Sequence, residues 1–101
     1  MVREEKRDSF TVILPSKGKA KKELDLLYKR RPKQLEKVIE KLKLSPTDFK
    51  IKGIEKLTED KLGEYTIRIS KGDRLFYDVN LKEKKVYIRH AGKHDFYKLL
   101  Q

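Results

Sequence analysis

The feature that most constrains the fold is a pair of alternating runs between Tyr65 and Asn80. Every second residue is apolar, first at Tyr65, Ile67 and Ile69 and then at Leu75, Tyr77 and Val79. A period of two is that of a β-strand with one buried face, so the stretch predicts a hairpin. The two apolar faces coincide only if the loop has an odd number of residues, such as Lys71 to Asp73. This loop would place Arg68 opposite Phe76.

Two further strands are predicted from β-branched and alternating runs. The run from Phe10 to Leu14 is closed by Pro15, and Lys85 to His90 follows the hairpin. Val79 and Val86 share a face only if the loop between their strands has an even number of residues. Such a loop would place Arg89 opposite Phe76, on the side of the Phe76 strand away from Arg68.

Two amphipathic helices are predicted between the first strand and the hairpin. The first has apolar residues at helical spacing up to Arg31, with Ser16 as its expected cap: Ala20, Leu24, Leu27 and Tyr28. The second begins at Pro32, ends at Ser45–Pro46, and has the spacing i, i+3, i+4, i+7: Leu35, Val38, Ile39 and Leu42.

The element order predicts an α+β fold formed by a single domain over residues 1–101. A two-helix hairpin is expected to pack on one face of a mainly antiparallel four-stranded sheet. Residues 45–62 show no sustained period and predict an irregular connection, and residues 1–8 predict a frayed end. The C-terminal segment predicts a short helix or a loop with a helical turn.

The charge balance favours an anionic partner. The 101 residues include 27 Lys and Arg against 16 Asp and Glu, a formal net charge of +11. Such a field attracts polyanions, above all nucleic acids, although a basic surface that serves solubility is the alternative. The absence of cysteine excludes disulfides, thiolate metal sites and cysteine nucleophiles. Without an apolar run of membrane-spanning length or a signal peptide, the expected location is the cytoplasm.

The predicted register brings basic and aromatic side chains together on the sheet face opposite the apolar one. They are Arg68, Arg74, Phe76, Tyr87 and Arg89. Guanidinium groups pair with phosphates and exposed rings stack on unpaired bases, so the cluster suits single-stranded RNA. In the alternative, the C-terminal segment buries the rings, the arginines pair with Asp78 or Glu64, and the face serves stability alone.

The C-terminal stretch "GKHDFY" contains one candidate for proton transfer. His94 has a usual pKa near neutrality and would lie beside the cationic sheet face. A structural role is favoured for His90, at the apolar edge near Leu75. The sequence has no phosphate-binding glycine loop, no zinc-protease motif and no serine triad, so kinases, oxidoreductases and proteases have no support.

Three motifs together resemble the RelE/ParE superfamily of toxins from type II toxin–antitoxin systems. They are the opening Leu62-Gly63-Glu64-Tyr65, which is one residue shorter than the family's Leu-x-Gly-x-(Tyr/Trp), the Arg-Leu-x-Tyr strand at Arg74–Tyr77, and the basic end Lys93–Tyr97. The resemblance spans roughly residues 10–100, and the order and spacing of the motifs are more specific than any one of them.

The resemblance implies an endoribonuclease that cuts mRNA in the ribosomal A site without a metal or other cofactor. The 2′-hydroxyl attacks the adjacent phosphate and leaves a cyclic phosphate. Arg74 would stabilise the charge of the phosphorane, and Arg68 would contact phosphate. His94 would be the leaving-group acid, and Tyr97 would stack on or act at the scissile nucleotide. Glu55 matches a catalytic glutamate of YoeB-like members if the alignment with them includes a one-residue insertion.

A second set of residues is predicted to bind the RNA around the catalytic group: Lys56, Phe76, Tyr87, Arg89 and Lys93. The resemblance also implies an acidic antitoxin that docks on the sheet or the helical hairpin, with no membrane and no small-molecule cofactor.

Two other functions remain open. One is a ParE-like inhibitor of DNA gyrase with the same fold and no chemistry, and the other is an inactive nucleic-acid-binding domain. The sequence departs from RelE at Thr66, where RelE has a lysine, and in its His94–Tyr97 end, which differs from the His-Tyr end of YoeB.

Overall fold

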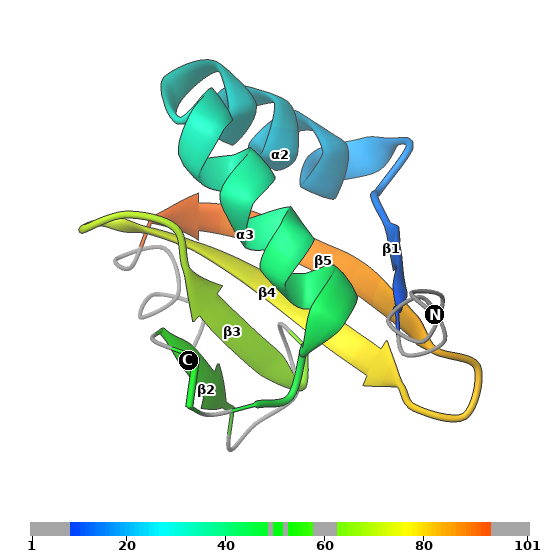
Figure 1. Cartoon of the computed structure of the whole chain (residues 1–101). Helices are drawn as coiled ribbons and strands as arrows, with labels where there is room; N and C mark the ends of the chain where they lie inside the picture. Colours follow the sequence, from blue (N-terminus) through cyan, green and yellow to red (C-terminus); the bar gives the residue numbers. More distant parts are fainter. Residues whose placement is uncertain (1–8, 49, 52, 58–62, 94–101) are drawn as a thin grey trace.

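The computed structural model describes residues 9–48, 50, 51, 53–57 and 63–93, which form one sheet and two helices (Figure 1). In chain order the elements are β1 (Thr11–Ile13), α2 (Gly18–Arg30), α3 (Pro32–Leu44), β2 (Ile54–Lys56), β3 (Tyr65–Arg68), β4 (Asp73–Asn80) and β5 (Lys85–Lys93). The strand order is β1-β5-β4-β3-β2, in which β1 runs parallel to β5 and the other neighbours are antiparallel. The predicted α+β class is therefore confirmed.

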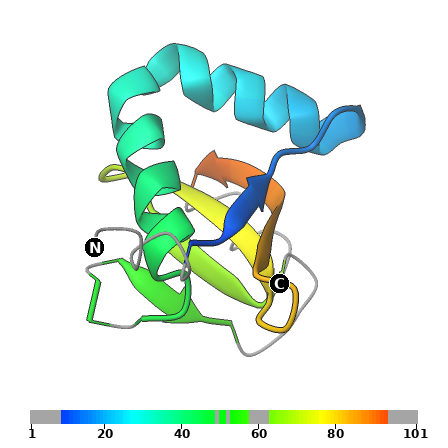
Figure 2. The ribbon, with the colours of Figure 1, turned by 45° about the vertical axis from the view of Figure 1, so that its right-hand side comes forward.

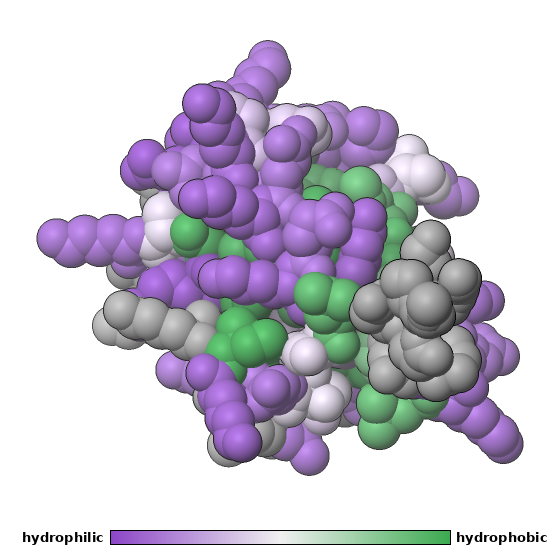
Figure 3. Space-filling model, viewed as in Figure 1, coloured by the Kyte–Doolittle hydropathy of each residue, from purple (hydrophilic) through white to green (hydrophobic). Residues whose placement is uncertain are grey.

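Both helices lie on one side of the sheet (Figure 2), and their apolar residues form the core with the strands. The buried residues are Leu24, Leu27, Leu35, Val38, Leu42, Ile54, Ile67, Ile69, Leu75, Tyr77, Val86, Ile88 and Ala91. Tyr77 has its ring stacked on Tyr65, with centroids 5.7 Å apart, and its hydroxyl donates to the Pro46 carbonyl oxygen at 2.7 Å. Burial raises the pKa of Tyr77 above its usual value. Hydrophilic side chains cover the outer surface of the helices (Figure 3).

The described sheet has five strands where four were predicted. The additional strand is β2, which lies in the segment predicted to be irregular and pairs antiparallel with β3. A strand of three residues is too short to show an alternating pattern, so its pairing with β3 is visible only in three dimensions.

The predicted register between β3 and β4 is wrong by two residues. Arg68 lies opposite Arg74 rather than Phe76, and Thr66 lies opposite Phe76. The turn lies one residue earlier in the chain than predicted, because the Ile69 amide donates to the Asp73 carbonyl oxygen at 2.8 Å. A shift of two residues preserves the faces, so the predicted assignment of side chains to faces holds.

The register between β4 and β5 follows the prediction from Asn80, opposite Lys85, as far as Tyr77, opposite Ile88. A β-bulge then places His90 opposite Phe76, so Arg89 is the extra residue and its predicted position opposite Phe76 is wrong. Beyond the bulge, β5 continues to Lys93, three residues further than predicted.

The start of the first helix also differs from the prediction. Lys17, not Ser16, is the N-cap residue, and its side chain makes no capping hydrogen bond. No helix in the described part of the chain is long and apolar enough to cross a membrane. The predictions for residues 1–8 and for the segment after Lys93 lie outside the described residues.

Candidate functional site

Two arginines lie directly opposite each other on the second face, which we define as the face of the sheet away from α2 and α3. Arg68 on β3 is exposed, whereas the side chain of Arg74 on β4 is only 10% exposed. Like charges at directly opposite positions destabilise an antiparallel pair. Stability therefore gives no reason for this pairing.

The guanidinium of Arg74 makes no hydrogen bond with any residue that the structure describes, and its Nη1 atom is buried and unpartnered. Its Nη1 atom lies 3.9 Å from Glu55 Oε1 on β2, which is too long for a hydrogen bond. A buried donor without an acceptor costs about 1–3 kcal/mol. Arg74 therefore has hydrogen-bonding capacity that the described residues do not use.

Gly53 fixes the backbone beside Arg68. Its φ is +97°, and a Cβ atom at this position would lie 2.9 Å from Arg68 Cβ. The Arg68 amide donates to the Gly53 carbonyl oxygen at 3.1 Å. A glycine is required here because the two backbones approach too closely for any side chain.

The middle of the second face is buried. Phe76 is 0% exposed and Thr66 is 1% exposed. The prediction that Phe76 presents an exposed ring is therefore wrong. Its strand, β4, lies in the middle of the strand order, and every residue from Asp73 to Tyr77 is buried. Thr66 uses its hydroxyl internally, donating to the Leu75 carbonyl oxygen at 2.9 Å.

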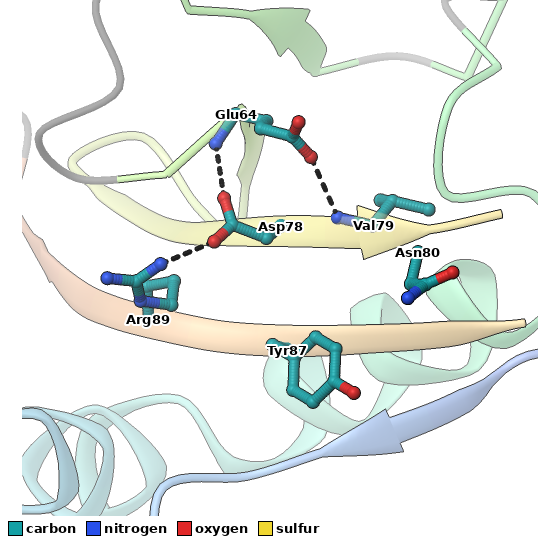
Figure 4. A pocket seen from close by; sticks show the side chains of 6 residues that line it. All are labelled: Glu64, Asp78, Val79, Asn80, Tyr87 and Arg89. Carbon is teal, nitrogen blue, oxygen red and sulfur yellow. Dashed lines mark hydrogen bonds and ion pairs between the residues drawn. The ribbon is translucent and has the colours of Figure 1, made fainter. Parts of the chain in front are cut away.

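At the other end of the second face there is an open pocket of about 390 Å³ (Figure 4). It is lined by Glu64, Asp78, Val79, Asn80, Tyr87 and Arg89. Arg89 forms an ion pair with Asp78, which is the pairing expected if the face serves stability. Tyr87, in contrast, is only partly buried and faces the pocket.

Gly63 allows the chain to form one wall of this pocket. Its φ is +139°, and a Cβ atom there would lie 3.0 Å from the Tyr77 carbonyl oxygen. The amide of Glu64 can therefore donate to the Tyr77 carbonyl oxygen at 3.0 Å and to Asp78 Oδ1 at 2.8 Å. The sequence analysis considered Glu64 and Asp78 only as arginine partners. A signal was present, since the predicted register already placed Asp78 opposite Tyr87.

A buried carboxylate next to Arg74 joins the helices to the β3–β4 turn. Asp73 accepts hydrogen bonds from Arg30 Nη2 at 2.7 Å and from Ser70 Oγ at 2.9 Å, and Arg31 Nε lies 3.5 Å from it. Burial opposes ionisation of Asp73, but these hydrogen bonds and the arginine charge outweigh it, so its pKa lies below the usual value. This cluster has no signal in the sequence, because Arg30 and Arg31 are about forty positions from Asp73.

The remaining predicted residues divide into three groups. Glu55 lies opposite Thr66 on the second face, close to Arg74, whereas Lys56 is the next residue along β2 and projects to the other face. The backbone of Lys93 ends β5 opposite Asp73. His94 and Tyr97 lie outside the described residues.

His90 contacts α2 rather than the second-face arginines. Its Nδ1 atom lies 3.1 Å from Glu23 Oε1, which also accepts a hydrogen bond from the Ala91 amide at 3.3 Å. This contact between β5 and α2 is consistent with the predicted structural role.

Comparison with known proteins identifies the fold. The chain is similar to a chain in the crystal structure of the toxin–antitoxin complex RelBE2 from Mycobacterium tuberculosis, with a TM-score of 0.57 and 21% sequence identity. The match covers 85% of this chain and 99% of the other. No family model and no curated protein matches the sequence. The fold is thus RelE-like, as the sequence motifs imply.

Proposed function

We propose that this protein is the toxin of a type II toxin–antitoxin module and that it cleaves mRNA bound to the ribosome. The observation that carries the proposal is Arg74, a buried guanidinium with no hydrogen bond in the described structure, directly opposite a second arginine. The fold match to a chain of a toxin–antitoxin complex and the net charge of +11 support the same reading.

The proposed reaction is an attack by the 2′-hydroxyl of one nucleotide on its own 3′-phosphate. The hydroxyl loses its proton to a base, the 2′ oxygen forms a bond to phosphorus, and the bond to the 5′ oxygen of the next nucleotide breaks. Protonation of that leaving oxygen gives a 2′,3′-cyclic phosphate and a 5′-hydroxyl end. Arg74 would stabilise the additional negative charge of the phosphorane, and Arg68 would orient the phosphate.

Arginine retains its proton under all ordinary conditions, so neither arginine is suited to proton transfer. Glu55, whose Oε1 atom lies 3.9 Å from Arg74 Nη1, is our candidate for the base. His94 is our candidate for the acid, and Tyr97 our candidate for a contact with the scissile nucleotide.

An antitoxin would be the partner that restrains this activity. The two helices and the loop between them contain eleven basic and four acidic residues between Lys17 and Lys43. We propose an acidic antitoxin that covers the second face or the helical hairpin, where charge complementarity favours its association.

The test is induction of the chain in a bacterial host that lacks the antitoxin, followed by mapping of mRNA 5′ ends. We expect growth arrest and new 5′-hydroxyl ends within coding sequences. Arg74→Lys retains the charge but loses the bidentate guanidinium, and should reduce cleavage strongly. Lys37→Gln, which changes one exposed charge on α3, is the control and should cleave like the wild type.

The same experiment separates the other functions of this fold. Growth arrest with intact mRNA and a DNA-damage response would contradict mRNA cleavage and favour a gyrase inhibitor. Normal growth on induction of the wild type would contradict a toxin role altogether.

A further inference from the structure

We propose that the pocket at the far end of the second face binds a guanine base of the RNA. The proposal rests on the proposed function in that the base would belong to the RNA held by Arg68 and Arg74. The pocket itself is assigned no role by that function. Its floor and walls come from β4, β5 and the residue before β3 (Figure 4).

The charge of the pocket differs from that of the protein as a whole. The chain has a net charge of +11, yet the pocket contains two carboxylates, from Glu64 and Asp78, and one guanidinium, from Arg89. That guanidinium is already paired with Asp78. A phosphate is therefore disfavoured in this pocket, whereas a group with N–H donors is favoured.

The hydrogen bonds of the lining residues show which atoms are left to meet a ligand. Glu64 accepts from the Val79 amide through Oε1, at 3.1 Å, and its other oxygen has no hydrogen bond with the described residues. Asn80 accepts from the Glu83 amide through Oδ1, at 2.9 Å, and its NH₂ group has no hydrogen bond with the described residues. The pocket thus presents a fixed carboxylate acceptor and an amide donor.

Guanine matches this pattern of donors and acceptors. Its Watson–Crick edge has two adjacent N–H donors, from N1 and N2, next to the O6 acceptor. The two donors suit the Glu64 carboxylate, and O6 suits an amide donor such as that of Asn80. Adenine, cytosine and uracil each lack the pair of adjacent donors.

Tyr87 supplies a surface for stacking. It lies opposite Asp78 on the floor of the pocket, is partly buried, and makes no ring contact with the described residues. Stacking of a base on an aromatic ring is a common contribution to the binding of single-stranded RNA. The combination of ring and carboxylate gives both affinity and selectivity for one base.

The position of the pocket fits an RNA strand that also reaches the arginines. Asp78 lies four residues from Arg74 on β4, which is about 13 Å at the rise of a β-strand. An RNA of a few nucleotides can span that distance. The ring of Phe76, which lies between the two sites, is 0% exposed and would not contact the strand.

The test measures binding of the four nucleoside 5′-monophosphates to the purified protein, by NMR titration, without ribosomes. We expect guanosine monophosphate to bind at least about tenfold more tightly than the other three. Glu64→Gln retains an oxygen for the Val79 amide but replaces the free acceptor by a donor, so it should remove this preference. Glu40→Gln makes the same change of charge on the exposed face of α3 and should leave the preference intact.

One further variant keeps the test decisive. Tyr87→Leu should weaken binding of all four nucleotides. If the NMR spectrum of Glu64→Gln shows that this variant is not folded, Tyr87→Leu takes its place in the test. Equal binding of the four nucleotides, no binding, or a guanine preference that survives Glu64→Gln would overturn the proposal.

If the guanine site is assigned wrongly, the results differ from those expected if the proposed function is wrong. Arg74→Ala should abolish cleavage but retain the preference for guanosine monophosphate. Binding without any cleavage by the wild type would contradict the nuclease reading alone. Cleavage by the wild type without a guanine preference in binding would contradict the pocket alone.

Discussion

Replacement of Arg74 by methionine should stabilise the protein while it abolishes function. Methionine has a comparable length and an apolar side chain, so it can fill a position that is 9% exposed. The change removes a buried donor that has no hydrogen bond in the described structure, which costs the wild type about 1–3 kcal/mol. It also removes the repulsion by Arg68 on the opposite strand, about 0.2–1 kcal/mol.

One term opposes this gain. The contact with Glu55 is lost, but its 3.9 Å distance and the 63% exposure of the glutamate limit its contribution to about 0–1 kcal/mol. The net expectation is a gain of about 1–2 kcal/mol. For a domain of this size the melting temperature should rise by roughly 4–15 °C.

The assay is chemical and thermal denaturation of wild type, Arg74→Met and Arg68→Met, followed by circular dichroism. Arg68→Met removes the same charge and the same repulsion from an exposed side chain, so it should change the free energy of unfolding by less than about 1 kcal/mol. A loss of more than about 1 kcal/mol in Arg74→Met would refute the reasoning, because it would show that the guanidinium stabilises the fold.

Three other predictions concern the framework of the site. In urea denaturation, Gly63→Ala should lower the free energy of unfolding by at least about 2 kcal/mol, since φ is +139° and the new Cβ would meet the Tyr77 backbone. The control is Gly72→Ala, whose new Cβ would have nothing within 4 Å, and it should change the free energy of unfolding by less than about 1 kcal/mol. Equal stability of the two variants would contradict the close approach. Tyr77→Phe leaves the Pro46 carbonyl oxygen without its 2.7 Å hydrogen bond and should lower the free energy of unfolding by about 1–3 kcal/mol in the same assay. An unchanged denaturation midpoint would show that the hydrogen bond is dispensable. The pKa of Asp73 is lowered from its usual 3.8 in the folded protein, so its stabilisation is present above that pH and lost as the pH falls below it. Asp73→Asn should therefore be less stable than the wild type at neutral pH and show a smaller further loss in acid; parallel pH profiles would contradict this.

The faces of the sheet could be predicted from sequence because they depend only on alternation. Tyr65 and Ile67 face the helices and Arg68 faces away, although the register was wrong by two residues. The exact pairing depends on where the turn after Arg68 closes, and the Ile69–Asp73 hydrogen bond places this turn one residue earlier than predicted. No local pattern in the sequence specifies that bond.

The details of the site depend on contacts between distant segments, which periodicity does not report. The bulge at Arg89 moves this residue from Phe76 toward Asp78, where it forms an ion pair. Three residues of β2 bring Glu55 to Arg74 from a segment without any period. The burial of Phe76 was only an alternative at the level of sequence, because alternation predicts the face of a side chain and not what lies over it.

The most direct test of the central claim is cleavage of a defined mRNA on purified ribosomes by the wild type and by Arg74→Met. We expect discrete fragments with cyclic phosphate ends from the wild type. We expect none from Arg74→Met, at equal concentrations of two folded proteins. Fragments of equal yield from both proteins, or none from the wild type, would contradict the claim.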